Sequence, residues 1–250
     1  MIKAITFDLW DTIIHDESDE PKRAAQGLDS KRRARRDVLW QALERQEPIP
    51  REVVDLAYDV QEAAFNHVWH QQHVTWTVAE RLDVVLTGLG RKLPDDDYRR
   101  VQSTLEEMEI QIKPDAIPGM RSALATLAQH YALAVVSDAI YTPGHKLREW
   151  LLSEDLLQYF SAFAFSDEVG HCKPHRSMFA HVATELGVEI PQMVHVGDRD
   201  HNDIKGPQAL GMQAVLFTVT RDSDREMTSA DAICDDPATL FEIIQNLARS

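Results

Sequence analysis

The chain has 250 residues, 44% of them hydrophobic, and a formal net charge of −15. A chain of this length and composition forms one large domain or two smaller ones around a real hydrophobic core. The strong negative charge argues against binding to nucleic acid or to an anionic membrane surface.

No apolar stretch approaches the roughly 20 residues that a membrane span needs. Met1 leads directly into a predicted strand, so we expect no export signal. Cys172 and Cys234 allow at most one bridge and have no metal-binding spacing, which favours a reducing compartment. We therefore expect a soluble, cytoplasmic protein without nucleic-acid or membrane partners; the sequence leaves the oligomeric state open.

The first predicted element is a strand over residues 2–7. Its β-branched and aromatic residues show no helical period, which is typical of a strand buried on both faces. Asp8 then lies at the carboxyl end of this strand. Ligands of open parallel sheets bind at that edge, so Asp8 is a candidate for chemistry.

Residues 15–115 read as an inserted helical bundle. Helices are predicted over residues 21–46, 51–72, 77–89 and 94–112, because prolines mark their starts and apolar residues recur at steps of three and four. Gly27 is a candidate break in the first helix. If that helix instead starts at Ser30, the basic run 31–36 lies in its first turns. Cations there are repelled by the helix dipole unless an anion or acidic side chains pair with them.

Three histidines, His67, His70 and His73, lie at three-residue steps at the end of the second predicted helix and just after it. Such steps drift around the helix by about 60° each, so the side chains diverge and a metal site is disfavoured. We expect these residues and their neighbouring tryptophans to pack against the bundle or line a pocket.

From residue 117 helices and strands alternate, which indicates a parallel sheet with covering helices. Strands are predicted over residues 132–136, 162–165, 193–196, 213–217 and 230–234, and helices over 118–130, 143–152, 174–186, 203–210 and 238–249. The predicted fold is therefore α/β, with a doubly wound parallel sheet from residues 1–14 and 116–250 and a helical domain from residues 15–115.

Polar residues end three of these strands: Asp8, then Ser137 with Asp138, then Asp198. Lys173 precedes a helix. One carboxylate can attack phosphorus, others can hold a hard divalent cation, and a serine with a lysine can bind the oxygens of the transferring group. Together these residues predict a site for phosphate and Mg²⁺.

The segments FDLWDT, VVSDA, CKP and HVGDRDHNDIKG resemble the four motifs of the haloacid dehalogenase superfamily, in their usual order. The helical insert lies where members of that family have a smaller cap domain. The resemblance implies that Asp8 is the nucleophile, Ser137 a phosphoryl ligand and Lys173 the neutralising cation. It also implies Mg²⁺ ligands, namely Asp8, the backbone carbonyl of Trp10, Asp198 and Asp203.

Two residues depart from that family pattern. The family's phosphatases have a second Asp two residues after the nucleophile as general acid and base, and Trp10 occupies that position. Losing a positioned acid or base typically removes about 10² to 10⁴ in rate. Asp11 is adjacent but should point away from Asp8, because side chains alternate along extended backbone. Asp138 stands where the family commonly has Asn.

The predicted substrate is a small anionic molecule, and the predicted contacts are Trp10, Asp11, Asp138, Arg32 and Arg36. Arg32, Arg35 and Arg36 are candidates to reach an anionic group from the helical domain. The favoured function is a Mg²⁺-dependent phosphatase that forms an aspartyl phosphate. One alternative is a 2-haloacid dehalogenase, which tolerates an aromatic residue at the Trp10 position; another is a weakly active member that binds a ligand or partner.

Overall fold

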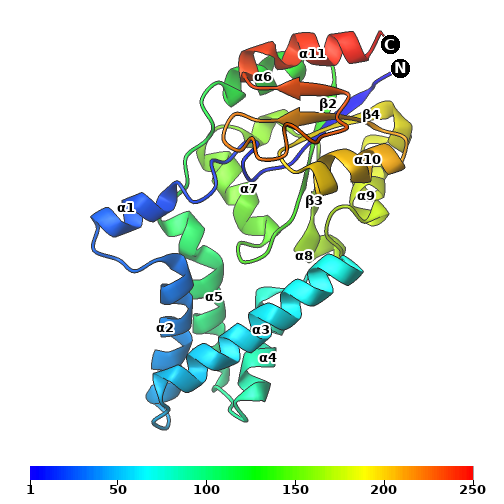
Figure 1. The fold of residues 1–250 in the computed structure, drawn as a ribbon. Helices are drawn as coiled ribbons and strands as arrows, with labels where there is room; N and C mark the ends of the chain where they lie inside the picture. Colours follow the sequence, from blue (N-terminus) through cyan, green and yellow to red (C-terminus); the bar gives the residue numbers. More distant parts are fainter. Residues whose placement is uncertain (250) are drawn as a thin grey trace.

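The computed structural model describes residues 1–249, which form a parallel sheet flanked by helices and a separate group of helices on one side of it (Figure 1). The strands are β1 (Ala4–Phe7), β2 (Ala132–Ser137), β3 (Ala162–Phe165), β4 (Met193–Gly197), β5 (Gln213–Phe217) and β6 (Ala232–Cys234). Their order is β3-β2-β1-β4-β5-β6, and all pairs are parallel. The predicted α/β class with a doubly wound parallel sheet is confirmed.

Strand β1 is central in the sheet and buried on both faces, as its composition predicts. Ile5 and Phe7 point to one face, where they pack against the helices α6 (Met120–Leu127), α7 (Gly144–Ser153) and α11 (Leu240–Leu247). Ala4 belongs to the opposite face, which is covered by α9 (Arg176–Leu186). Two apolar layers therefore fix the position of β1 and of the residue that follows it.

Short helical segments complete this part of the chain. They are α8 (Ser166–Val169), the π-helix η3 (Asp200–Lys205), α10 (Gly206–Ala209) and the 3-10 turns η1 (Leu157–Tyr159), η2 (Ile190–Gln192) and η4 (Pro237–Thr239). The single helix predicted over residues 203–210 is thus two elements that begin at Asp200. None of the helices described in residues 1–249 is long and apolar enough to cross a membrane.

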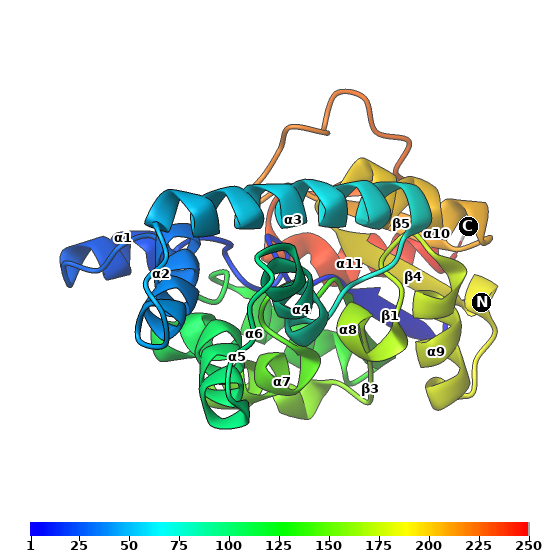
Figure 2. The ribbon, with the colours of Figure 1, turned by 90° about the horizontal axis from the view of Figure 1, so that it is seen from below.

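Five helices lie between β1 and α6: α1 (Asp19–Ala25), α2 (Lys31–Glu44), α3 (Arg51–Gln72), α4 (Val78–Gly88) and α5 (Asp95–Gln111). Helices α2 to α5 share an apolar core that includes Leu39, Leu43, Leu82 and Leu105. Seen from below, the long α3 crosses this group and ends near α8 and α9 (Figure 2). The predicted division into two domains at residues 15 and 115 stays a prediction, but these helices have a hydrophobic core of their own.

The first predicted helix is broken at Gly27, which has a φ of +71°, a conformation that glycine adopts readily. Helix α2 starts after Ser30, whose hydroxyl accepts a hydrogen bond from the Arg33 amide at 3.3 Å. The basic run 31–36 therefore lies in the first turns of α2, which is the alternative that requires acidic partners. Acidic side chains of α1, α3 and α5 form ion pairs with these basic residues. The ion pairs offset the repulsion between the basic residues and the positive end of the helix dipole.

Candidate active site

Asp8 lies at the carboxyl end of β1, where the chain order of the sheet reverses between β1 and β4. Its backbone amide donates to the carbonyl of Val196 in β4 at 2.9 Å, which extends the sheet pairing to this residue. The Asp8 residue is only 6% exposed. Because β2 and β4 flank β1, Ser137 and Asp198 end at the same edge, as expected for a ligand site in an open parallel sheet.

Lys173 connects two of the predicted acids. Its Nζ lies 2.8 Å from Asp8 Oδ1 and 2.6 Å from Asp203 Oδ1, and the side chain is almost fully buried. Burial by itself lowers the pKa of an amine, but the carboxylates of Asp203 and Asp8 outweigh it and raise the Lys173 pKa. Lys173 is therefore a permanent cation beside the candidate nucleophile.

Asp203 is held from several sides. Its Oδ1 lies 3.1 Å from His195 Nε2, and its Oδ2 accepts the Arg199 amide at 2.9 Å. Burial raises the pKa of a carboxyl, but Lys173 and His195 overcome this and lower the Asp203 pKa. A Cβ on Gly197 would lie 2.4 Å from Asp203 Cγ, so glycine is required there for Asp203 to pack.

His195 was not predicted as a site residue. It lies inside β4, is fully buried, and its Nδ1 contacts the Thr6 hydroxyl at 2.8 Å. Burial lowers its pKa, which favours the neutral ring. A histidine within a buried strand was the available signal, since such a polar ring requires partners.

Asp198 is a buried carboxylate to which no group of the described residues donates a hydrogen bond. Neither of its side-chain oxygens has a hydrogen-bond partner among residues 1–249, and Asp198 is 1% exposed. Arg221 Nη1 and Arg199 Nε approach Asp198 Oδ2 only to 3.5 and 3.8 Å. Burial, followed by the charges of Asp203 and Asp8, raises the Asp198 pKa to about 8.

A metal ion would resolve this arrangement. Oxygen atoms of Asp8, Asp198 and Asp203 all lie within 4.8 Å of one another, and no other group of this kind is found in the described part of the chain. A set of carboxylate oxygens is the chemistry that Mg²⁺ prefers. The residues therefore fit the implied cation, and the unpartnered oxygens of Asp198 are the strongest sign of it.

Ser137 ends β2 and is fully buried, and its hydroxyl has no hydrogen-bond partner within residues 1–249. Its predicted role as a phosphoryl ligand stays a prediction. Asp138 follows it with a carboxylate turned inward: Oδ1 accepts the Lys173 amide at 2.9 Å, and Asn202 lies 3.5 Å from Oδ2. Burial raises the Asp138 pKa to about 7, although Lys173 opposes it.

Trp10 lies beside these groups. Its indole Nε1 donates to the Asp138 backbone carbonyl at 3.2 Å. That hydrogen bond orients the ring and uses its one donor. An indole N–H is too weak an acid to protonate a leaving group. Trp10 is thus a wall of the site and not a substitute for the usual acid.

Asp8 opens into a cavity of about 280 Å³ between the sheet edge and the helices. Its walls are Asp8, Trp10, Asp16, Glu17, Lys31, Arg35, Trp69, Glu109, Asp138, Ile140, Tyr141, Lys173, Arg199, Asn202 and Asp203. The predicted contacts Trp10 and Asp138 are among them. The contribution of α2 comes from Lys31 and Arg35.

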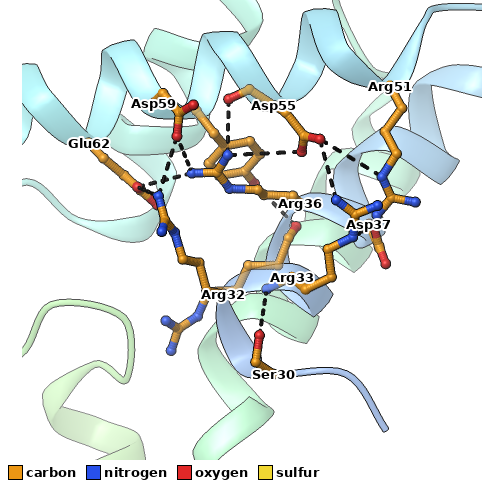
Figure 3. Close-up of polar contacts among 11 residues, drawn as sticks. Ser30, Arg32, Arg33, Arg36, Asp37, Arg51, Asp55, Asp59 and Glu62 are labelled. Atoms are coloured by element: carbon orange, nitrogen blue, oxygen red, sulfur yellow. Dashed lines mark hydrogen bonds and ion pairs between the residues drawn. The ribbon is translucent and has the colours of Figure 1, made fainter.

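Arg32 and Arg36, predicted to contact the substrate, do not line this cavity, and their substrate contact stays a prediction. Arg36 Nη2 pairs with Asp59 at 2.7 Å and Glu62 at 3.1 Å, and Arg32 reaches the same two acids at 3.4 Å (Figure 3). Positions 32 and 36 are one turn apart, so both face α3. Lys31 and Arg35 form the adjacent row, and that row faces the cavity.

Asp11 is not among the cavity walls either, and its predicted substrate contact stays a prediction. Its φ is +53°, so the turn after β1 leaves the extended conformation at this residue. Its Oδ1 accepts the Asp16 amide at 3.3 Å. Asp11 therefore organises the turn that carries Asp16.

The histidines of α3 do not form a metal site in the described residues. His67 and His70 are exposed, while Trp69 packs with Phe65 and Cys172 between α3 and the sheet domain. The expectation of packing is thus confirmed for the tryptophan.

Asp16, a cavity residue that was not predicted, has a pKa raised to about 6, chiefly by burial and then by the charges of Glu109 and Asp11. An unfolded Asp titrates near 3.8, so between about pH 4 and 6 the native state binds more protons than the unfolded state. Stability should therefore fall as the pH rises through this window. We expect Asp16→Asn to remove this loss and to raise the free energy of unfolding at pH 8 by roughly 1 kcal/mol.

Urea unfolding of wild type and Asp16→Asn at pH 4.5 and pH 8 measures this effect. The exposed Asp222 supplies the matched control, Asp222→Asn. If the free energies of unfolding of wild type and Asp16→Asn differed by the same amount at both pH values, titration of Asp16 would not be the cause of the pH-dependent stability.

A family model for haloacid dehalogenase-like hydrolases matches residues 2–211. The chain is 26% identical over 264 aligned residues to a glyceraldehyde 3-phosphate phosphatase of Methanopyrus kandleri, with 100% of both chains covered. It is 40% identical over 158 residues to a phosphoglycolate phosphatase of Salmonella typhi, which covers 59% of this chain and 61% of that protein.

Two solved structures share the fold. A 2-haloacid dehalogenase from Pseudomonas syringae pv. Tomato DC3000 has a TM-score of 0.69 at 20% identity, covering 99% of this chain and 100% of its own. A HAD phosphatase from Thermococcus onnurineus has a TM-score of 0.64 at 23% identity, covering 97% of this chain and 98% of its own. At these identities the likeness concerns the fold alone.

Proposed function

Since the chain belongs to the haloacid dehalogenase-like hydrolases, as the match over residues 2–211 shows, we propose that it is a Mg²⁺-dependent phosphatase of a small phosphorylated metabolite. The observation that carries the proposal is Asp198, a buried carboxylate with two unpartnered oxygens beside Asp8. A divalent cation would offset the negative charge of Asp8, Asp198 and Asp203 that Lys173 leaves unneutralised. Relatives named as phosphatases support the same reaction class.

In the proposed reaction, a carboxylate oxygen of Asp8 attacks phosphorus and displaces the leaving alkoxide, which gives an aspartyl phosphate that water then hydrolyses. Lys173 holds Asp8 in place and offsets charge on the phosphoryl oxygens. The unpartnered Ser137 hydroxyl is available to one of those oxygens. Asp203, whose oxygens already accept from Lys173, His195 and the Arg199 amide, positions Lys173.

Mg²⁺ would be held by Asp8, Asp198 and the predicted Trp10 carbonyl, with Asp203 adjacent, and would supply charge neutralisation at the phosphoryl group when bound. The proton for the leaving group cannot come from Trp10. The enzyme should therefore favour leaving groups that need little protonation, such as aryl or acyl phosphates, over simple alkyl phosphates.

The test is phosphate release from para-nitrophenyl phosphate, acetyl phosphate and a panel of alkyl phosphates, with Mg²⁺ and with chelator. The proposal expects release that chelator abolishes and that is fastest for the activated esters. Chelator-insensitive release, or no release from any compound, would contradict it.

One observation favours a second candidate, a 2-haloacid dehalogenase: an aromatic residue, Trp10, faces the cavity beside the nucleophile. In that reaction Asp8 attacks carbon and displaces halide. A dehalogenase has no use for the unpartnered carboxylate of Asp198, so this function ranks second. Chloride release from 2-chloropropionate in the presence of chelator would reverse the ranking.

The third candidate is a weakly active member that binds a ligand. Its motivation is the combination of Trp10 and Asp138 at positions where the family's phosphatases differ. Calorimetric binding of a phosphate ester without turnover across the panel would support it, whereas robust turnover would exclude it.

A further inference from the structure

The wall of the cavity contributed by α2 is basic. Lys31 and Arg35 lie one turn apart on the helix, and both line the cavity into which Asp8 opens. They come from the helical segment, whereas Asp8 and Lys173 come from the sheet edge. A molecule whose phosphate sits at Asp8 would therefore extend its other end toward α2.

The Lys31 ammonium is held in place. Its Nζ lies 2.8 Å from Asp19 Oδ1 and 3.2 Å from Glu109 Oε1, and its side chain is 7% exposed. An ammonium has three N–H donors, and these two carboxylates take two of them. One donor is left for a group in the cavity.

Arg35 has an ion-pair partner and a ring contact, but one of its N–H groups lacks an acceptor among the described residues. Its Nη2 donates to Glu109 Oε1 at 3.2 Å, and its guanidinium carbon lies 3.6 Å from the centre of the Tyr141 ring. Tyr141 is itself fixed, because Arg81 Nη2 donates to its hydroxyl at 2.6 Å. The buried Nε of Arg35 has no hydrogen-bond partner in residues 1–249.

The acids around these cations do not remove the need for a further acceptor. Glu109 Oε1 is shared between Lys31 and Arg35, and its Oε2 accepts the hydroxyl of Thr142. A buried guanidinium with unused N–H groups is costly unless an acceptor reaches it. The Nε of the neighbouring Arg36 also lacks a partner among the described residues, but both Nη atoms of Arg36 have acceptors, which come from three residues of α3.

Building on the proposed phosphatase function, we propose that Lys31 and Arg35 form a distal anion subsite, which selects phosphate esters whose far end carries a carboxylate. A planar carboxylate accepts two parallel N–H groups of a guanidinium, a geometry that a hydroxyl or aldehyde does not provide. The cavity of about 280 Å³ limits the ester to a short one. Glu109 and Tyr141 position Arg35 for this contact.

Three two-carbon phosphate monoesters test the subsite: 2-phosphoglycolate with a carboxylate end, ethyl phosphate with a neutral end and phosphoethanolamine with a cationic end. Wild type should have the highest kcat/KM for 2-phosphoglycolate. Charge-assisted hydrogen bonds of this kind support a preference of roughly 10- to 100-fold. In Arg35→Gln the KM for 2-phosphoglycolate should rise by a similar factor, while kcat/KM for ethyl phosphate stays within about twofold.

Arg33→Gln is the matched control, because Arg33 lies on the same helix but pairs with Asp55 and Asp37 away from the cavity. It should keep the wild-type preference. Arg35→Lys keeps a cation and should recover part of the preference, which separates loss of charge from loss of folding.

Equal kcat/KM for 2-phosphoglycolate and ethyl phosphate in wild type would overturn the subsite while leaving the phosphatase function intact. A preference for phosphoethanolamine would also overturn it and would assign the selectivity to Asp16 and Glu17. If none of these three alkyl esters were turned over, release from para-nitrophenyl phosphate and acetyl phosphate would still decide the phosphatase function. Calorimetric binding of the three esters to Asp8→Asn would then decide the subsite by the same ranking.

Discussion

Replacing Asp8 by asparagine is expected to reduce Mg²⁺-dependent phosphate release by roughly 10⁴-fold or more, the scale on which loss of a covalent nucleophile acts. The amide of asparagine is a far weaker nucleophile than a carboxylate. It still accepts a hydrogen bond from Lys173, which lies 2.8 Å from Asp8 Oδ1 in wild type. The fold should therefore persist, and the loss should appear in kcat and not in KM for a substrate that equilibrates before chemistry.

Steady-state release from para-nitrophenyl phosphate measures this effect, and rapid acid quench with labelled substrate tests for a phosphorylated protein. Wild type should carry acid-stable label that Asp8→Asn lacks. Asp235→Asn makes the same chemical change at an exposed residue that pairs with Arg225, and it should behave as wild type. An Asp8→Asn enzyme with wild-type activity would remove Asp8 from the mechanism.

The sheet and the edge that carries the site were predictable because they depend on local signals. The β-branched run before Asp8 and the alternation after residue 117 identify the parallel strands, and parallel strands bring their carboxyl ends to one edge. Asp8 and Asp198 follow two such strands, whereas Asp203 was predicted only by the family resemblance; oxygens of all three lie within 4.8 Å of one another.

The helical wall of the cavity was less predictable because it depends on how α2 is rotated against its neighbours. The run from Lys31 to Arg36 gives two basic rows one residue apart, and the sequence does not say which row meets the cavity. The acids of α3 pair with Arg32 and Arg36, so the other row faces Asp8. Those acids lie more than 20 residues away in the chain.

Buried partners within the sheet were missed for a similar reason. His195 read as one residue of a strand, whereas its contacts with Thr6 and Asp203 exist only because β1 and β4 are neighbours. The conformation of the turn after Asp8 could not be predicted either, because the positive φ of Asp11 depends on packing that the local sequence does not specify.

The second prediction of large effect concerns Asp198. Substituting asparagine should abolish the stabilisation of the protein by Mg²⁺ and reduce phosphatase activity by about 10²-fold or more, because the unpartnered carboxylate is the ligand best placed for the ion. Wild type should gain thermal stability on addition of millimolar Mg²⁺, since a ligand of the native state stabilises it by mass action. Asp198→Asn should show no such gain.

In chelator the same substitution should have the opposite effect on stability. The native pKa of Asp198 is raised to about 8 against about 3.8 when unfolded, so the native state binds more protons between these values. Metal-free wild type should therefore lose stability as the pH rises from about 4 to 8. Asparagine removes the buried charge, but its own amide is left unpaired, which costs part of the benefit. The net increase in the free energy of unfolding should be roughly 1 to 3 kcal/mol at pH 8.

Thermal unfolding in EDTA at pH 5 and pH 8, repeated with Mg²⁺, measures both effects on the same proteins. In EDTA at pH 8 the melting temperature of Asp198→Asn should exceed that of wild type, and at pH 5 the two should be close. In Mg²⁺ wild type should have the higher melting temperature. Asp224→Asn is the matched control, because Asp224 also pairs with Arg221 but has the Asp200 amide as a donor. If Mg²⁺ stabilised Asp198→Asn as much as wild type, the ion would bind elsewhere, and the proposed metal site would be wrong.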